Sequence, residues 1–172
     1  MRILDTIFGE VLLFKRGYRQ DCRGTSAVIG TDGLPSDFKI CEQRAYTIPK
    51  AGAFFGIHYD DGSRPRAKLI TVIRGAGDDY IIDLRKDSST YLKWERVRLS
   101  GENALCIYIP MGFGHGFLSV CDDTIQLFSA DRSGADCRTM RISCYDETIG
   151  LGLPDGVILS DEDMTAPPIC QI

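Results

Sequence analysis

The stretch from Tyr80 to Ile109, YIIDLRKDSSTYLKWERVRLSGENALCIYI, decides the fold of this chain. It contains three short runs rich in β-branched, aromatic and other apolar residues, at 80–84, 91–99 and 104–109, and the last two runs flank the turn signal SGEN. Short runs of this composition between turn residues are typical of strands. The stretch therefore predicts three strands in succession, with no helix between them.

The apolar residues within 91–99 change phase along the run. Leu92 and Trp94 share one face, whereas Val97 and Leu99 take the other. One β-bulge near Glu95 would restore a single apolar face, and so would a strand that passes from one sheet to the next.

The same pattern extends over the rest of the chain. Further strands are expected at 10–14, 25–29, 38–46, 53–59, 68–74, 116–120, 124–130 and 139–144, with short helical pieces only near 34–37 and 161–164. Many short strands with regular turns favour a sandwich or barrel over an α/β fold. We expect residues 1–172 to form a single all-β domain, because this length fits one compact domain. An inward-pointing polar residue in such a fold is a candidate for function.

Composition narrows the classes of partner. The net charge of −4 and the pI near 5.2 argue against a nucleic-acid partner. Asp5 and Glu10 interrupt the apolar residues of the N-terminus, and no run is long enough to span a membrane, so neither a signal peptide nor a membrane segment is expected. The seven cysteines include no C-x-x-C pair, which favours reduced thiols and the cytoplasm. A basic cluster at 64–68 could contact a single phosphorylated ligand.

The only two histidines have distinctive surroundings. His58 lies in FGIHY at 55–59, and His115 follows the glycine-rich run PMGFG. Strand alternation places His58 on the face of Gly56, and glycine within a strand often marks the close approach of a ligand or another backbone. A histidine in a β core is also typical of a hydrogen-bonded structural residue. With two distant histidines and no H-x-H pair, no metal site is expected, and no P-loop, dinucleotide fingerprint or nucleophile elbow occurs.

Several motifs resemble, in order, those of one enzyme family. They are GIHY at 56–59, KL at 68–69, DLRKDS at 83–88, KW at 93–94, LSGEN at 99–103, IPMGFGHGF at 109–117 and YDETIGL at 145–151. The pattern is similar to that of the dTDP-4-dehydrorhamnose 3,5-epimerases, and DCRG at 21–24 resembles a further element of that family.

The resemblance implies both a fold and a reaction. The implied fold is a double-stranded β-helix, the cupin-like jelly roll, assembled as a homodimer, with no metal or other cofactor. The implied reaction inverts carbons that flank the keto group of a nucleotide-diphosphate 4-keto-6-deoxy sugar. Such a C–H proton is acidic only because the carbonyl can hold the resulting charge as an enolate. The site therefore needs a base, an oxyanion stabiliser and a proton donor on the opposite face.

The resemblance assigns the base and the oxyanion stabiliser to specific residues. His58 takes the position of the base, and an imidazole suits that role near neutral pH. Asp146 matches the carboxylate that pairs with the base, and Lys68 matches the lysine that stabilises the enolate oxygen. Two alternatives stay open: Asp146 could be a turn residue, and Lys68 a solvated strand end. Substrate contacts are implied for Arg23, Gln43, Asp79 and His115.

The third part of the site, the proton donor, is missing from the sequence. Phe128 occupies the substrate-contacting position where the family has a tyrosine that acts as general acid, and phenylalanine has no proton to give. Phe55 likewise stands where the family has a phosphate-binding arginine. The aromatic residues expected within 129–134 and at 25–26 are absent as well.

These departures leave three hypotheses. The leading one is an epimerase that abstracts an α-proton from a nucleotide-linked keto sugar, with a different nucleotide, sugar or stereochemical outcome. Inversion at one carbon, with water or another side chain returning the proton, is physically reasonable. The second is a catalytically inactive relative that binds a sugar nucleotide. A ketoisomerase ranks last, because related ketoisomerases carry closely paired histidines and this chain does not.

Overall fold

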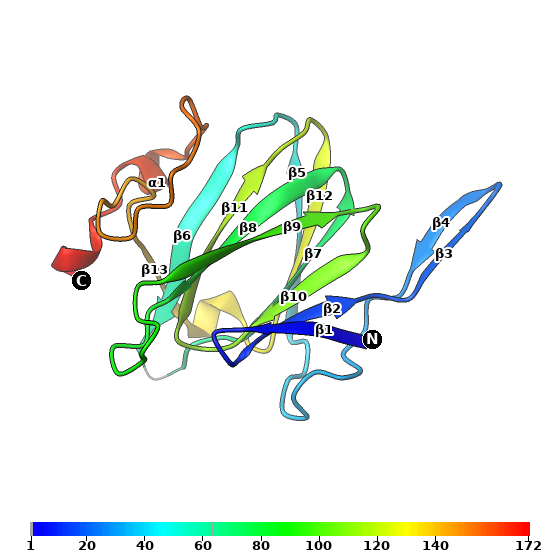
Figure 1. The fold of residues 1–172 in the computed structure, drawn as a ribbon, viewed down its shortest axis with the longest axis horizontal. Coiled ribbons are helices and arrows are strands. Elements are labelled where there is room, and N and C mark those ends of the chain that lie inside the picture. Colours follow the sequence, from blue (N-terminus) through cyan, green and yellow to red (C-terminus); the bar gives the residue numbers. More distant parts are fainter. Residues whose placement is uncertain (1, 63) are drawn as a thin grey trace.

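The computed structural model describes residues 2–62 and 64–172, and two antiparallel sheets dominate it (Figure 1). The first sheet has the order β1 (Arg2–Ile7), β2 (Val11–Lys15), β10 (Leu105–Ile109), β7 (Lys68–Arg74), β12 (Thr124–Ala130) and β5 (Glu42–Ile48). The second has the order β13 (Arg138–Arg141), β6 (Phe54–Asp61), β11 (Phe113–Ser119), β8 (Ala76–Asp83) and β9 (Trp94–Ser100). The expected all-β jelly roll is confirmed.

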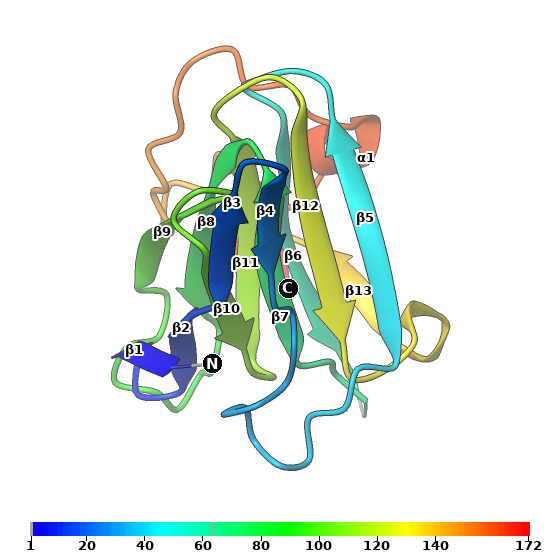
Figure 2. The same ribbon diagram turned by 90° about the vertical axis from the view of Figure 1, so that its right-hand side faces the viewer.

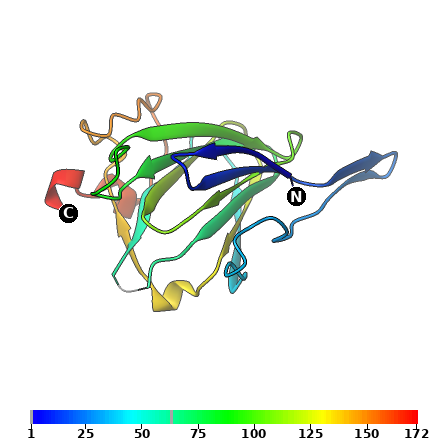
Figure 3. The ribbon, with the colours of Figure 1, turned by 60° about the horizontal axis from the view of Figure 1, so that its bottom comes forward.

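Two segments extend beyond the sheets on opposite sides of the molecule (Figure 3). A hairpin of β3 (Tyr18–Asp21) and β4 (Gly24–Ala27) projects from one side. The C-terminal segment lies at the other and contains the helix α1 (Asp161–Met164). Single 3₁₀ turns occur at Gly134–Asp136 and Ile169–Gln171. Across the described ranges, no helix is long and apolar enough to cross a membrane.

The short helix expected near 161–164 is confirmed, whereas the one expected near 34–37 is wrong, because those residues form turns. The phase change within 91–99 has a different origin from the two expected. Residues 91–93 form a turn, Leu92 has a φ of +62°, and β9 begins only at Trp94. From there β9 pairs with β8 without a register shift. Neither a bulge near Glu95 nor a change of sheet is present.

The apolar core consists of three clusters, which are separated by the two sheets. The central cluster lies between the sheets and draws on both, with Ile70 and Ile107 from one and Ile81 and Phe117 from the other. A second covers the outer face of the five-stranded sheet and includes Leu151 of the C-terminal segment. A third lies around Phe14, against residues 34–40. The C-terminal segment is thus packed onto the back of the sheet that carries both histidines.

A bulge in β6 determines which of its side chains face inward. His58 pairs with His115 and Phe55 with Phe117, so β6 advances by three residues where β11 advances by two. As a result, Phe55 and His58 both face the space between the sheets, whereas Ile57 packs on the outer face. The close approach inferred at Gly56 is made by a neighbouring backbone: a Cβ there would lie 2.7 Å from Gly116 Cα.

We expect Gly56→Ala to destabilise the fold far more than Gly52→Ala. Both glycines have positive φ, +128° and +84°, so each substitution costs about 1–2 kcal/mol of backbone strain. Only at Gly56 does the new methyl group also meet backbone atoms, which adds about 1–3 kcal/mol of overpacking. Urea unfolding of the two variants measures the difference, and equal losses of stability would contradict the tight contact between β6 and β11.

Candidate active site

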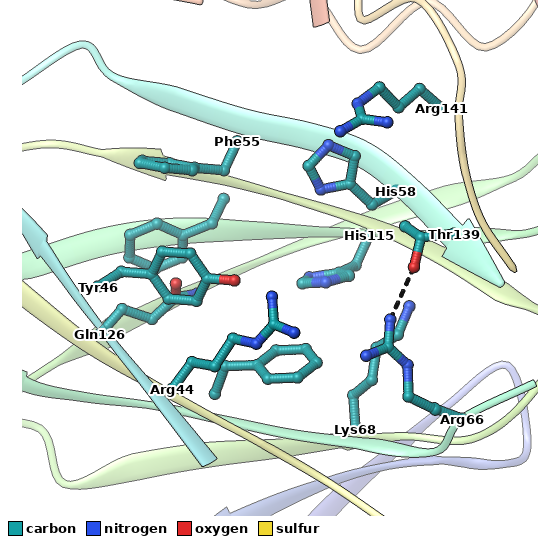
Figure 4. Close-up of a pocket in the computed structure, with 12 residues that line it drawn as sticks. Arg44, Tyr46, Phe55, His58, Arg66, Lys68, His115, Gln126, Thr139 and Arg141 are labelled. Atoms are coloured by element: carbon teal, nitrogen blue, oxygen red, sulfur yellow. Dashed lines mark hydrogen bonds between the residues drawn. The ribbon is translucent and has the colours of Figure 1, made fainter. Parts of the chain in front are cut away.

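A cavity of about 240 Å³ lies between the two sheets (Figure 4). The five-stranded sheet and the six-stranded sheet form opposite walls of this cavity. The first wall carries Phe55, His58, His115, Phe117, Thr139 and Arg141. The second carries Arg44, Tyr46, Lys68, Gln126 and Phe128, with Arg66 just before β7. Polar and ionisable groups from distant parts of the chain therefore face one cavity.

His58 is oriented by a carboxylate of α1. Its Nε2 lies 2.7 Å from Asp163 Oδ1, and the side chain of Asp163 is only 5% exposed. We assign the Nε2–H tautomer on this contact, because an ionised carboxylate can only accept. The other ring nitrogen, Nδ1, then keeps its lone pair, and the ring faces the cavity (Figure 4). The pair has the geometry of a base with its orienting carboxylate.

The prediction that Asp146 pairs with His58 is wrong. Asp146 Oδ1 accepts a hydrogen bond from the backbone N–H of Ile149 at 2.9 Å, and Oδ2 accepts one from Ile169 at 2.7 Å. Both bonds fasten the C-terminal segment to itself, so Asp146 is the turn residue of the alternative interpretation. The packing of this segment on the outer face of the sheet brings Asp163, not Asp146, to the histidine.

Further contacts keep Asp163 ionised beside His58. Burial raises the pKa of Asp163, but the hydrogen bond and charge of His58 and the N–H of Gly56 outweigh it, and the pKa stays below its ordinary value. Arg141 Nε lies 3.2 Å from Asp163 Oδ1 and adds a positive neighbour. Arg141 also forms an ion pair with Glu162. An anionic Asp163 favours the imidazolium that forms when His58 accepts a proton.

Lys68 lies in a buried charged cluster on the opposite wall. Its side chain is 3% exposed, and its Nζ is 3.8 Å from Asp60 Oδ2. Arg66 binds both oxygens of Asp60, at 2.9 and 3.0 Å, and also Thr139 Oγ1 at 2.8 Å. Burial raises the pKa of Asp60, but the Arg66 hydrogen bonds and the nearby cations lower it to about 2. Lys68 is therefore not a solvated strand end.

Desolvation also acts on the lysine itself. Burial lowers the pKa of Lys68 below its ordinary value, and the Asp60 carboxylate opposes this effect. Arg66 and Lys68, two members of the basic cluster noted in the sequence, both line the cavity, whereas Arg64 is exposed and does not. An ammonium group in such a place can stabilise a negative oxygen strongly, because little water competes for it.

His115 and Asp79 form a second pair, deeper between the sheets. His115 Nδ1 lies 3.5 Å from Asp79 Oδ1, and neither Asp79 oxygen has a hydrogen bond within the described residues. Burial lowers the pKa of His115 and raises that of Asp79. His115 borders the cavity directly, and Asp79 lies behind it. A neutral imidazole there can exchange hydrogen bonds with a ligand without adding charge.

Phe128 lies in the cavity wall, at the position where the sequence lacks a proton donor. Its ring stacks on that of His115, with centroids 6.4 Å apart, and Arg66 lies 5.8 Å from its centroid. Phe55 also lines the cavity, where it makes an edge-to-face contact with Tyr46. These two aromatic side chains add apolar surface to the cavity wall.

Besides Asp79, two more of the predicted substrate contacts lie outside the cavity of their own chain. Gln43 points to the other face of β5, where its Nε2 donates to Ser129 Oγ at 3.0 Å. Strand alternation explains this, since its neighbour Arg44 faces inward. Arg23 lies on the projecting β3–β4 hairpin, 86% exposed and ion-paired with Asp21. Neither residue reaches the cavity within one copy of the chain.

Sequence reasoning missed several groups of the site, among them residues of the cavity wall and Asp163 behind His58. Arg44 and Tyr46 are two residues apart on β5, so their side chains point to the same face of the strand. This strand periodicity was the signal that could have placed both in the cavity. Thr139 and Arg141 share one face of β13 in the same way. Asp163 carried no such signal, because its role arises from the packing of α1 against β6.

Comparisons with known proteins agree on one family. A family model described as dTDP-4-dehydrorhamnose 3,5-epimerase matches residues 6–171. A dTDP-4-dehydrorhamnose 3,5-epimerase from Methanothermobacter thermautotrophicus is 34% identical over 164 residues, which are 93% of this chain and 86% of the relative. A dTDP-4-dehydro-6-deoxyglucose 3-epimerase from Streptomyces bikiniensis is 32% identical over 135 residues, 77% of this chain and 68% of the relative.

A solved structure extends the similarity to the whole fold. The crystal structure of dTDP-4-dehydrorhamnose 3,5-epimerase from Bacillus anthracis, with TDP and PPi bound, superposes with a TM-score of 0.90 at 28% identity. The match covers 98% of this chain and 99% of that chain.

Proposed function

The chain is an isomerase of the dTDP-4-dehydrorhamnose 3,5-epimerase family, and from this premise we propose that it epimerises a nucleotide-linked 4-keto-6-deoxy sugar. One observation carries the proposal: His58, backed by Asp163, and Lys68 face the same cavity from opposite walls. A base and a cation in that arrangement suit the removal of a proton next to a ketone.

In the proposed first step, His58 Nδ1 removes the proton from a carbon next to the keto group. Asp163 holds the ring by its Nε2–H and stabilises the imidazolium. The electron pair of the C–H bond moves onto the keto oxygen, and the ammonium of Lys68 stabilises the resulting enolate. The charged cluster around Asp60 fixes the position of Lys68, because a buried ammonium needs a partner.

The nucleotide-diphosphate end of the substrate suits the cationic part of the cavity. Arg44 is exposed and Arg141 is half-buried, so their guanidinium groups can pair with phosphate oxygens. The relatives named above are called after dTDP-linked sugars, which makes a dTDP sugar the first substrate to test. The Streptomyces relative is named as a 3-epimerase, so inversion at a single carbon has a precedent within the family.

The cytoplasm is the proposed location and a homodimer the proposed assembly. Arg23 supports the dimer. Because the hairpin holds it away from the cavity of its own chain, it could contact a substrate only from a partner copy. A catalytically inactive, nucleotide-sugar-binding relative is the second candidate, and Phe128 is the observation that favours it.

Deuterium exchange separates these two candidates. The protein is incubated in D₂O with dTDP-4-keto-6-deoxyglucose, and with the GDP-linked 4-keto sugar as the comparison. We expect NMR to detect deuterium at one or both carbons next to the ketone, with the preferred nucleotide sugar exchanging faster. If neither sugar exchanges at any of these carbons although a nucleotide binds, the chain is the inactive relative.

A further inference from the structure

Inversion at a carbon needs a proton donor on the face opposite the base, and Phe128 has no proton to offer there. We propose that Tyr46 is this donor, an inference that rests on the function proposed above. Tyr46 comes from β5, at the edge of the six-stranded sheet, and its hydroxyl points into the cavity (Figure 4).

The two walls of the cavity meet the requirement for opposite faces. His58 belongs to β6 of the five-stranded sheet, whereas Tyr46 belongs to the six-stranded sheet across the cavity. A flat enolate bound between the sheets therefore presents one face to His58 and the other to Tyr46. His115 lies on the same wall as His58, so it could return a proton only to the face from which the proton was taken.

Tyr46 is also close to the wall position that lacks a donor. β12 and β5 run side by side (Figure 2), with Gln126 opposite Tyr46 and Phe128 opposite Arg44. Tyr46 and Phe128 are thus diagonal neighbours on one face, and such neighbours are about 7–8 Å apart, with their Cβ atoms somewhat closer. A long aromatic side chain spans that distance, so the phenol of Tyr46 can serve the region lined by Phe128.

The other polar groups on this wall are poorer donors. Arginine does not give up its proton in proteins, and the amide of Gln126 is not an acid. Lys68 is held by Asp60 at 3.8 Å, and in the first step its charge is needed at the enolate oxygen. Of the groups on this wall, only Tyr46 has an acidic proton and is not needed to stabilise the enolate oxygen.

The contacts of Tyr46 fix its ring in the cavity. The ring packs edge-to-face on Phe55, with centroids 5.6 Å apart and an interplanar angle of 65°. Arg44 lies two residues before Tyr46 on the same face of β5, and its guanidinium is paired with Glu42.

The proton balance closes without a co-reactant. His58 takes a proton from one face of the carbon, and the C–H electrons become those of the enolate. The enolate carbon then forms a new C–H bond with the proton of the Tyr46 hydroxyl on the other face, and the ketone re-forms. The imidazolium of His58 loses its proton to water, and the Tyr46 phenolate takes one from water.

Tyr46→Phe tests the proposal in D₂O with the dTDP-4-keto sugar, with exchange and inversion followed separately by NMR. His58 still removes the proton in this variant, and its deuterated imidazolium can return deuterium to the same face. We therefore expect exchange with retention to continue within several-fold of the parent rate, while the inverted product forms at least about 10²-fold more slowly. A residue with a purely structural role would not separate these two rates.

Tyr145→Phe is the matched control, because Tyr145 is 61% exposed and lies outside the cavity, and it should change neither rate. If Tyr46→Phe inverts the substrate at more than half the parent rate, or loses exchange together with inversion while dTDP still binds, the assignment is overturned. If the parent protein exchanges no proton, the proposed function fails and Tyr46 has no role as donor. If the parent exchanges and inverts but Tyr46→Phe inverts equally well, only the assignment of Tyr46 fails.

Discussion

Replacing His58 with asparagine is expected to reduce exchange of the α-proton by about 10³- to 10⁴-fold, near the upper limit for loss of a general base. Asparagine keeps a polar side chain of similar reach, but its amide cannot accept a proton at neutral pH. The loss should appear in single-turnover exchange as well as in kcat, because the step removed is the chemical one. NMR in D₂O with the dTDP-4-keto sugar measures it.

Binding provides the control for this variant. His58 contributes one part of the cavity wall and no contact to the cluster around Lys68, so the affinity for dTDP should stay within several-fold of the parent value by calorimetry. An epimerase therefore loses turnover and keeps its ligand. Exchange by His58→Asn at the parent rate would mean that another group removes the proton, and the proposed mechanism would be wrong.

The fold was predictable from sequence where strands have one buried face. Residues 124–130 were predicted with the bounds that β12 has, because the run TIQLFSA contains β-branched and aromatic residues, lies between turns and is buried or half-buried throughout. β1 and β3 were missed, and their side chains are exposed along almost the whole of both strands. A strand without a buried face has no apolar alternation, and pairing with a neighbour leaves no mark on the sequence.

The site was predictable only in part, for a related reason. His58 and Lys68 lie within motifs and on strands, so the resemblance assigned them to positions that line one cavity in the structure. Asp146 also lies in a motif, but its oxygens bind backbone N–H groups in the C-terminal segment. Asp163 belongs to the acidic run DEDM, and nothing in those four letters indicates which carboxylate turns inward. Its selection depends on how α1 docks on β6, a contact between segments 105 residues apart.

The replacement Asp163→Asn tests directly whether Asp163, and not Asp146, is the carboxylate that acts on His58. We expect kcat to decrease by about 10²- to 10³-fold with little change in the affinity for dTDP, because the carboxylate both fixes the tautomer of His58 and stabilises its imidazolium. An amide has no charge to offer the imidazolium, and its NH₂ group can donate to Nε2 and so favour the wrong tautomer. Steady-state kinetics and calorimetry on the same preparation separate the two effects.

Asp146→Asn is the matched control, since Asp146 is likewise a buried aspartate that fastens the C-terminal segment. It should lose one of its two backbone hydrogen bonds and about 1–2 kcal/mol of stability, because an amide can accept at only one of the two sites. Its kcat should stay near the parent value at temperatures where it is folded. The reverse result, with full activity in Asp163→Asn and a large loss of kcat in Asp146→Asn, would restore the pairing that the sequence suggested. The comparison therefore separates a carboxylate that acts on the base from one that only holds the segment in place.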